Sequence, residues 1–491
     1  MDRLWTRRQL GKLGAALALA PVPSWSQAEP RRGLVRVTRG AAFLPTPVSV
    51  PAGEVWRYGI IYPFQVAPRL AAVFCNIRKA LNPGVDFELG SDVLLFDSLD
   101  AIRSDTAVQI SRNHEEPNPN SRPPNERAVM VKYPVSGAFV PAGAKRPDGS
   151  PHPHAGTGFG LATAQAWPQH DRDLGHNPDR IGRRAYPGGQ AHEYLELQQL
   201  SYDGTRFRAE KTEAMVKSRA TVGGWALHSN PIRNGIADGD DLLLPYSCRR
   251  AGPGASLRSL VASGVLRFRR TAGLWQPHSF LPVTPEDGSW EPSLIRDVDG
   301  SLLLCARGLG EPNGTRIRVW RSADGGSTWR LQIEALGAIS MSPVSINQAA
   351  DGTPYVAANV FEVPLWPIGD ERYNHSAYRA AGDGRRRRLG GWLRERLVLW
   401  PLSPDRDRLA SPIVARDCRK EFGAPPGGSS WHADHPSAMN LQLRDGSWHN
   451  ILGYRILERA EATHAIAPAP QSGAYIEEVL SSGPPLPAWH F

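Results

Sequence analysis

Short β-rich units separated by Asp-Gly pairs recur along much of this 491-residue chain. These pairs include Asp203-Gly204, Asp299-Gly300, Asp351-Gly352 and Asp445-Gly446. An Asp-Gly pair favours a tight turn, because glycine accepts positive φ and the aspartate side chain bonds the following backbone. These pairs lie 96, 52 and 94 residues apart, which is about one or two times the 40–55 residues of a four-stranded propeller blade. The pattern therefore predicts an all-β repeat fold.

Composition supports that prediction. The chain has 48 Gly and 44 Pro, about 19% of its residues, which favours many turns and few long helices. With 41% hydrophobic and 21% charged residues, it has enough apolar mass for a packed core. The net charge of +9 would suit an acidic glycan, since guanidinium groups grip carboxylates. The basic residues are spread out without regular aromatic interleaving, so nucleic acid is not expected as a partner.

The first 28 residues resemble a twin-arginine export signal. Arg7-Arg8 precedes a short apolar run at 13–20, and Ser26 and Ala28 are small residues that a signal peptidase accepts. No later stretch approaches the length of a membrane-spanning segment, so no membrane association is expected after signal removal. The sequence predicts a periplasmic or secreted protein whose single domain covers residues 29–491.

Four cysteines, Cys75, Cys248, Cys305 and Cys418, lie far apart in the sequence. An oxidising compartment would allow disulfides, and buried free thiols are an equal alternative.

Residues 322–329 read S-A-D-G-G-S-T-W and fit the pattern S-x-D-x-G-x-T-W. This segment resembles the Asp box of bacterial-neuraminidase repeats, which is found in the sialidase superfamily. The resemblance covers roughly residues 195–460 and implies a six-bladed β-propeller, with the N-terminal third completing the ring through long loops. Strand-like pieces in that third are expected at 55–62, 71–75 and 128–133.

A second segment resembles the part of sialidases that supplies two active-site residues. Glu291 precedes an apolar strand, and Arg307 follows the Asp299-Gly300 turn at the end of the next one. In that family the Glu activates a tyrosine nucleophile and three arginines hold the substrate carboxylate. The resemblance implies that Glu291 is a catalytic base or acid and that Arg307 and Arg394 bind substrate.

Two later parts of the chain depart from the sialidase pattern. Where sialidases carry their tyrosine, residues 432–435 read H-A-D-H, and the strand after the last Asp-Gly turn ends with Tyr454-Arg455. We therefore assign Asp434 and His435 to the catalytic group and Tyr454 to substrate binding. Trp366, Trp392 and Trp431 are candidate sugar-stacking platforms.

A second cluster, containing His154, supports an alternative chemistry. In a uronate lyase a histidine removes the proton next to a carboxylate while arginine neutralises the developing enolate. His154 or His435 could fill that role. No metal or other cofactor is predicted.

The sequence thus predicts an exported, sialidase-like glycoside hydrolase that acts on an acidic glycan or oligosaccharide. The alternatives are a uronate-polysaccharide lyase on a propeller scaffold and a non-catalytic glycan-binding propeller.

Overall fold

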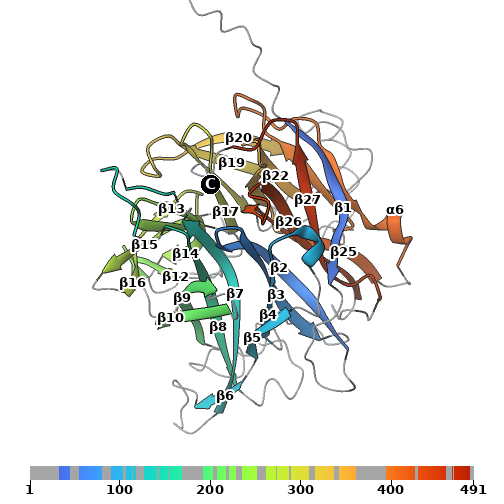
Figure 1. Ribbon diagram of the computed structural model, residues 1–491, viewed down its shortest axis with the longest axis horizontal. Helices are drawn as coiled ribbons and strands as arrows, with labels where there is room; N and C mark the ends of the chain where they lie inside the picture. Colours follow the sequence, from blue (N-terminus) through green and yellow to red (C-terminus); the bar gives the residue numbers. More distant parts are fainter. Residues whose placement is uncertain are drawn as a thin grey trace, which may run out of the picture.

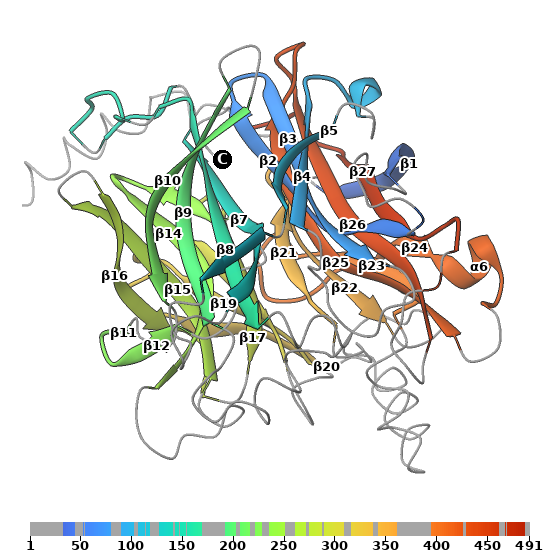
Figure 2. The ribbon, with the colours of Figure 1, turned by 90° about the horizontal axis from the view of Figure 1, so that it is seen from below.

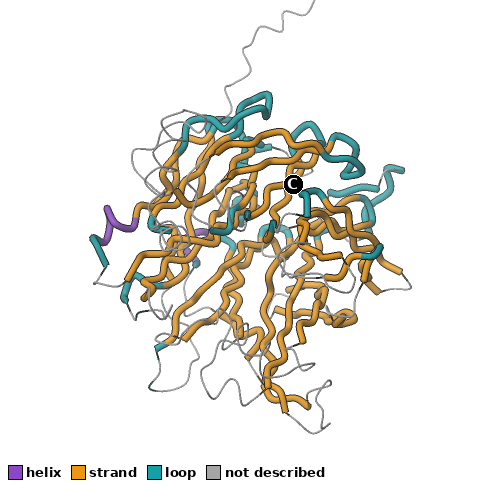
Figure 3. Tube along the Cα trace, turned by 180° about the vertical axis from the view of Figure 1, so that it is seen from behind, coloured by secondary structure: helices purple, strands orange, loops and turns teal. Residues whose placement is uncertain are grey.

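The computed structural model describes the residues in these ranges: 33–44, 53, 55–79, 90–102, 107–112, 114–117, 127–140, 143–146, 148–153, 155–168, 192–202, 207–216, 221–227, 235–250, 261–271, 274–286, 289–308, 316–336, 342–360, 394–425, 429–460, 467 and 469–486. Strands dominate them (Figure 3). In this part of the chain the helices are the short η1 (Leu99–Ala101) and α6 (Cys418–Phe422).

The described strands form six antiparallel sheets, of which four have the regular four-stranded form. The first regular sheet contains β2 (Trp56–Ala67), β3 (Leu70–Lys79), β4 (Gly90–Phe96) and β5 (Ala107–Arg112). The second contains β17 (Trp290–Arg296), β18 (Leu302–Arg307), β19 (Arg316–Ser322) and β20 (Arg330–Leu336). The third contains β21 (Ser345–Gln348), β22 (Pro354–Val360), β23 (Arg396–Pro401) and β24 (Ile413–Asp417). The fourth contains β25 (Ser429–Gln442), β26 (Trp448–Ala460), β27 (Gly473–Ser481) and β1 (Leu34–Leu44).

Two sheets depart from the four-stranded form that the sequence predicts for every blade. A five-stranded sheet contains β6 (His114–Pro117), β7 (Arg127–Val140), β8 (Thr157–Pro168), β9 (His192–Tyr202) and β10 (Phe207–Val216). A six-stranded sheet contains β11 (Thr221–Val222), β12 (Trp225–Leu227), β13 (Ile236–Asp238), β14 (Asp241–Arg250), β15 (Val261–Thr271) and β16 (Leu274–Pro282). The three strand-like pieces predicted in the N-terminal third lie in β2, β3 and β7.

The first strand of each regular sheet contacts the first strand of its neighbours. β17 contacts β14 and β21, β21 contacts β25, β25 contacts β2, and β2 contacts β7, which in turn contacts β13. The fold is therefore an all-β propeller, with these strands around a central axis. Figures 1 and 2 show the sheets following one another in chain order.

The ring closes with strands from opposite ends of the chain. β1 pairs antiparallel with β27, so a blue strand lies beside a red one in Figure 1. The Thr38 hydroxyl donates to the carbonyl of Glu478 at 3.1 Å and accepts from its amide at 3.2 Å. This pairing covers the edge of β27 and joins the two ends of the chain in one sheet.

Three of the four Asp-Gly pairs form the predicted turns, and Asp203-Gly204 lies outside the described residues. Gly300, Gly352 and Gly446 have φ of 83°, 86° and 82°, and they connect the first two strands of three successive sheets. The preceding Asp carboxylate accepts a backbone N–H two residues on, as from Ser301 at 2.9 Å. Here only glycine avoids the cost of positive φ.

The turn at 322–329 joins β19 to β20 and is held by its own side chains. The Asp324 carboxylate accepts bonds from the Ser322 hydroxyl and from the amide and hydroxyl of Thr328, at 2.6–2.8 Å. The Trp329 indole N–H donates to the carbonyl of Gly326 at 3.0 Å. These bonds lower the pKa of Asp324 to about 2, with the Thr328 hydroxyl contributing most.

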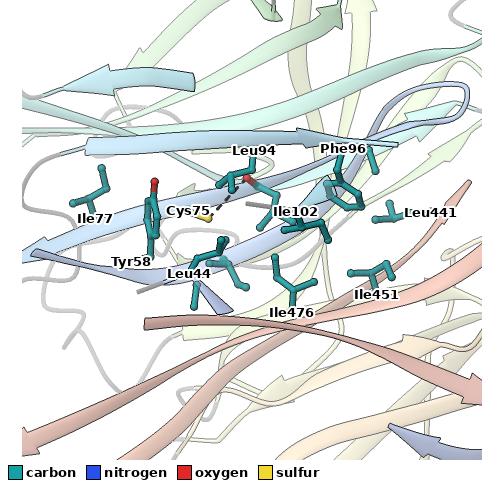
Figure 4. Packing of buried hydrophobic residues seen from close by; sticks show 14 of the residues in the cluster. Leu44, Tyr58, Cys75, Ile77, Leu94, Phe96, Ile102, Leu441, Ile451 and Ile476 are labelled. Carbon is teal, nitrogen blue, oxygen red and sulfur yellow. Dashed lines mark hydrogen bonds between the residues drawn. The ribbon is translucent and has the colours of Figure 1, made fainter. Parts of the chain in front are cut away.

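The apolar core lies between adjacent sheets rather than within any one of them. In Figure 4 Tyr58 and Cys75 of the first regular sheet face Leu44, Ile451 and Ile476 of the sheet that closes the ring. Because each sheet buries both faces against neighbours, inner strands such as β14, β18 and β22 are nearly continuously buried, whereas the outer strand β20 is partly exposed.

All four cysteines are buried free thiols, so of the two alternatives the structure selects free thiols over disulfides. In the described ranges no helix is long and apolar enough to cross a membrane. The predicted signal at 1–28 lies outside the described residues.

Candidate functional site

Two β-bulges place strained residues close to the propeller axis. Glu291 follows the start of β17, where the register with β18 shifts, and its φ is 50°. His435 lies where the register of β25 with β26 shifts, and its φ is 56°. Non-glycine residues with positive φ cost free energy and cluster at functional sites.

Glu291 forms an ion pair with Arg307 across the first two strands of its sheet. An Arg307 Nη donates to Oε2 of Glu291 at 2.9 Å. About 15% of the Glu291 side chain and 17% of the Arg307 side chain remain exposed, so solvent can reach both groups. The Glu291 carboxylate is thus paired with a cation and still accessible.

A second group of site residues bonds to the carboxylate of Asp434. Asp434 is fully buried, and its carboxylate accepts hydrogen bonds from Arg394 and, at 2.7 Å, from Arg455 of β26. Burial alone would raise its pKa, but the charges of Arg455 and Arg394 hold the pKa well below its usual range. Asp434 is therefore a permanent anion.

His435 bonds to the same carboxylate. Its Nδ1 lies 2.9 Å from Oδ1 of Asp434, which accepts the Nδ1 proton and leaves Nε2 as the basic nitrogen. Burial, and then the charge of Arg455, lower the pKa of His435 to about 4. The imidazole is thus neutral at pH 7 and able to accept a proton.

Arg394 is held by backbone contacts between two sheets. It forms a parallel bridge with His432, and its carbonyl accepts the amide N–H of Ala433 at 2.8 Å. The buried Asn359 side chain donates to the carbonyls of Arg394, at 3.2 Å, and of Ala433, at 2.7 Å. Asn359 therefore fixes the end of β23 against β25.

The Glu291–Arg307 pair and the residues bonded to Asp434 interact electrostatically with each other. The charge of Glu291 acts to raise the pKa of His435, and the charge of Arg307 acts to lower that of Arg394. We call the set Glu291, Arg307, Arg394, Asp434, His435 and Arg455 the axial cluster. It contains three cations, two anions and one neutral imidazole, which favours an anionic ligand.

The structure thus brings together five of the seven site residues predicted from the sequence. Asp434 differs from its predicted catalytic role in being fully enclosed, so it orients His435 and two arginines rather than facing a substrate. His154 lies outside the described residues. Its neighbour His152 is buried and contacts the carbonyl of Gly239.

Tyr454 does not join the axial cluster. It is fully buried on the opposite face of β26 from Arg455, where its hydroxyl accepts from Nε of Arg416 at 2.8 Å. Its ring stacks on Tyr475 with centroids 5.7 Å apart. Successive residues of a strand point to opposite faces, so Arg455 and Tyr454 could not both reach the site.

Trp431 is also packed rather than available for sugar stacking. Only 3% of it is exposed, and its indole N–H donates to the carbonyl of Gly423 at 3.0 Å. Trp366 and Trp392 lie outside the described residues.

Arg455 is the member of the axial cluster that the sequence analysis missed. The available signal was its position, one residue after Tyr454 at the end of the strand that follows the last Asp-Gly turn. Among the residues that the structure describes, no group of three or more His, Cys, Asp or Glu side chains could hold a metal ion.

The fold and the axial cluster define an all-β propeller with an arginine-rich, proton-accepting site on its axis. No family model matches the chain, and no curated protein matches its sequence.

Solved structures share the chain trace at low identity. A protein of unknown function from Dyadobacter fermentans DSM 18053 has a TM-score of 0.49 and 12% identity, over 90% of this chain and 99% of that one. Trypanosoma rangeli sialidase in complex with 2,3-difluorosialic acid has a TM-score of 0.49 and 14% identity, over 91% of this chain. The Hadza microbial sialidase Hz136 has a TM-score of 0.49 and 11% identity, over 86% of this chain. The chain spans 59% of the first sialidase and 66% of the second.

Proposed function

We propose that this protein is a sialidase-like glycoside hydrolase that acts on a carboxylate-bearing glycan. The observation that carries the proposal is the convergence of Glu291 with Arg307, Arg394 and Arg455 at one place on the axis. Arginine binds carboxylates through paired hydrogen bonds, and three of them exceed the charge of the two acids in the cluster.

Each group has a defined role in this proposal. Arg307 and Arg394 hold the sugar carboxylate, and Glu291, which is paired with Arg307, accepts a proton from the attacking nucleophile. Asp434 is the positioning residue that fixes the tautomer of His435. The six sheets would form six blades of one ring, and residues 1–28 would direct export to the periplasm or the outside.

A second candidate, uronate lyase, is favoured by the His435–Asp434 pair. A lyase needs an unprotonated base that removes the proton next to the carboxylate, and a pKa of about 4 leaves His435 unprotonated at pH 7, as a weak base. The arginines would then stabilise the enolate that develops.

Product analysis separates the two candidates. The chain 29–491 is incubated with sialosides and with uronate polysaccharides, following released saturated sugar and the ultraviolet absorbance of unsaturated uronate. For a hydrolase, Glu291→Gln should lower the release of saturated sugar by about 10²–10⁴-fold. Glu286→Gln, which alters a carboxylate whose described ion-pair partner is the exposed Arg250, is the matched control.

Growth of ultraviolet absorbance that His435→Asn abolishes would move the assignment to the lyase. No turnover of any of these substrates would refute both, and retained binding would then leave a glycan-binding propeller.

A further inference from the structure

A second recess lies on the propeller axis, beside the axial cluster. It is a cavity of about 540 Å³, within the size range of small-molecule sites. The strands β7, β13, β17, β21 and β25 contribute to its lining. Because the cavity lies on the axis, residues from five sheets line it.

The cavity and the axial cluster use different ends of the same strands. On β17 the cluster uses Glu291, whereas the cavity is lined by Ser293–Arg296. On β25 the cluster uses Asp434 and His435, whereas the cavity is lined by Ser437–Asn440. At a strand rise of about 3.3 Å per residue, Glu291 lies about 7 Å along β17 from Ser293, the first lining residue on that strand, and about 13 Å from Ile295. The cavity therefore adjoins the axial cluster and is lined by different residues.

The cavity wall is largely apolar. Phe139, Val140, Ile236, Ile295, Ile346 and Met439 contribute to it. Such a lining favours a ligand with an apolar body, because burying that body removes apolar surface from water.

Two polar groups of the lining have no partner in the described part of the chain. Nε2 of Gln348 and the hydroxyl of Ser437 are buried without a hydrogen bond there, and the two residues are only 8% and 1% exposed. A buried donor without an acceptor costs free energy, which a ligand oxygen would recover.

The charge of the lining is positive. Lys145 and Arg296 line the cavity, and no Asp or Glu does. The two carboxylates on either side of the lining residue Gly239 are paired: Asp238 bonds Arg296 and Arg267, and Asp240 bonds Arg146. Lys145 is therefore an excess cation, which favours an anionic ligand.

We propose that this cavity is a second ligand site for a small carboxylate with an apolar body. The carboxylate accepts hydrogen bonds from Gln348 and Ser437 and is attracted by Lys145, while the body packs on the apolar wall. The site does not depend on the glycan chemistry proposed for the axial cluster.

Calorimetric titration of chain 29–491 with octanoate tests the proposal. Octanoate should bind saturably at one site, about tenfold or more tightly than the neutral 1-octanol and than the sugar acid glucuronate. No saturable binding of octanoate, equal binding of 1-octanol, or tighter binding of glucuronate would each overturn it.

Two variants locate the site without threatening the fold. Gln348→Met and Ser437→Ala remove groups that have no described partner, so thermal stability should stay equal or rise while octanoate affinity falls about tenfold. Ser327→Ala, on an exposed turn, is the matched control and should bind as the parent does. Unchanged octanoate affinity in both cavity variants would exclude this site. Glu291→Gln should not alter octanoate binding, so failure here is distinguishable from failure of the proposed function.

Discussion

Glu291 and His435 are two of the four described non-glycine residues with positive φ. The other two, Arg69 and Arg406, lie in turns, where such conformations are common. The strained backbone of Glu291 and His435 costs of order 1–3 kcal/mol each and persists only where surrounding contacts enforce it. The ion pair of Glu291 with Arg307 and the hydrogen bond of His435 with Asp434 supply those contacts.

At the scale of single residues, we expect the free energy of unfolding to fall when the solution is made mildly acidic. The pKa is lowered to about 3 for His432 and to about 4 for His435, in both cases chiefly by burial, against an unfolded value near 6.5. Between those values the unfolded chain binds more protons than the folded one, so this stabilisation is complete above pH 6.5 and is lost as the pH falls.

The effect can be measured by denaturant unfolding between pH 7 and pH 4.5. Each histidine contributes up to about 1.4 kcal/mol per pH unit to the change in the free energy of unfolding. The variant His432→Asn should lose the contribution of one histidine. His449→Asn is the contrasting control. Glu478 raises the pKa of His449, so its contribution is complete below pH 6.5 and is lost as the pH rises. An identical slope in His432→Asn and the parent would contradict the prediction.

At the scale of the element, close packing between strands depends on particular glycines. A Cβ built on Gly264 of β15 would lie 2.1 Å from the carbonyl oxygen of Leu281 on β16. Backbone cannot move aside as a flexible side chain does, so the two strands would have to separate.

Gly264→Ala should therefore destabilise the protein by about 3 kcal/mol, measured by chemical denaturation. Gly33→Ala, whose Cβ would meet nothing within 4 Å, should change stability by less than about 0.5 kcal/mol. Equal stabilities of the two variants would show that β16 is not packed against β15 in this way.

At the scale of the whole molecule, stability depends on closing the ring. β1 supplies the outer strand of a sheet whose other three strands come from the C-terminal end of the chain. It also contributes Leu44, which is 1% exposed, to the core in Figure 4.

A chain that begins at residue 45 should lose at least about 2–5 kcal/mol, the usual cost of removing one large core side chain, and should unfold at a lower temperature. A chain that begins at residue 33 keeps β1 and is the control. Equal melting temperatures for the two would show that β1 does not close the ring.

Local patterns were sufficient to predict much of this fold. The Asp-Gly turns and the 322–329 turn are determined by residues within eight positions of one another, so the sequence predicts them directly. The Glu291–Arg307 pair was also predictable, because two hydrogen-bonded strands joined by a short turn bring its members together.

The sequence by itself thus determined an all-β repeat chain, its turns, and five members of the axial cluster. Only the tertiary structure decided that Arg455 and not Tyr454 faces the axis, that the cysteines stay free, and that two sheets depart from four strands. Each of these depends on which face of a strand meets which neighbouring sheet. A shift of one residue at a bulge reverses that choice, and the sequence pattern does not reveal the shift.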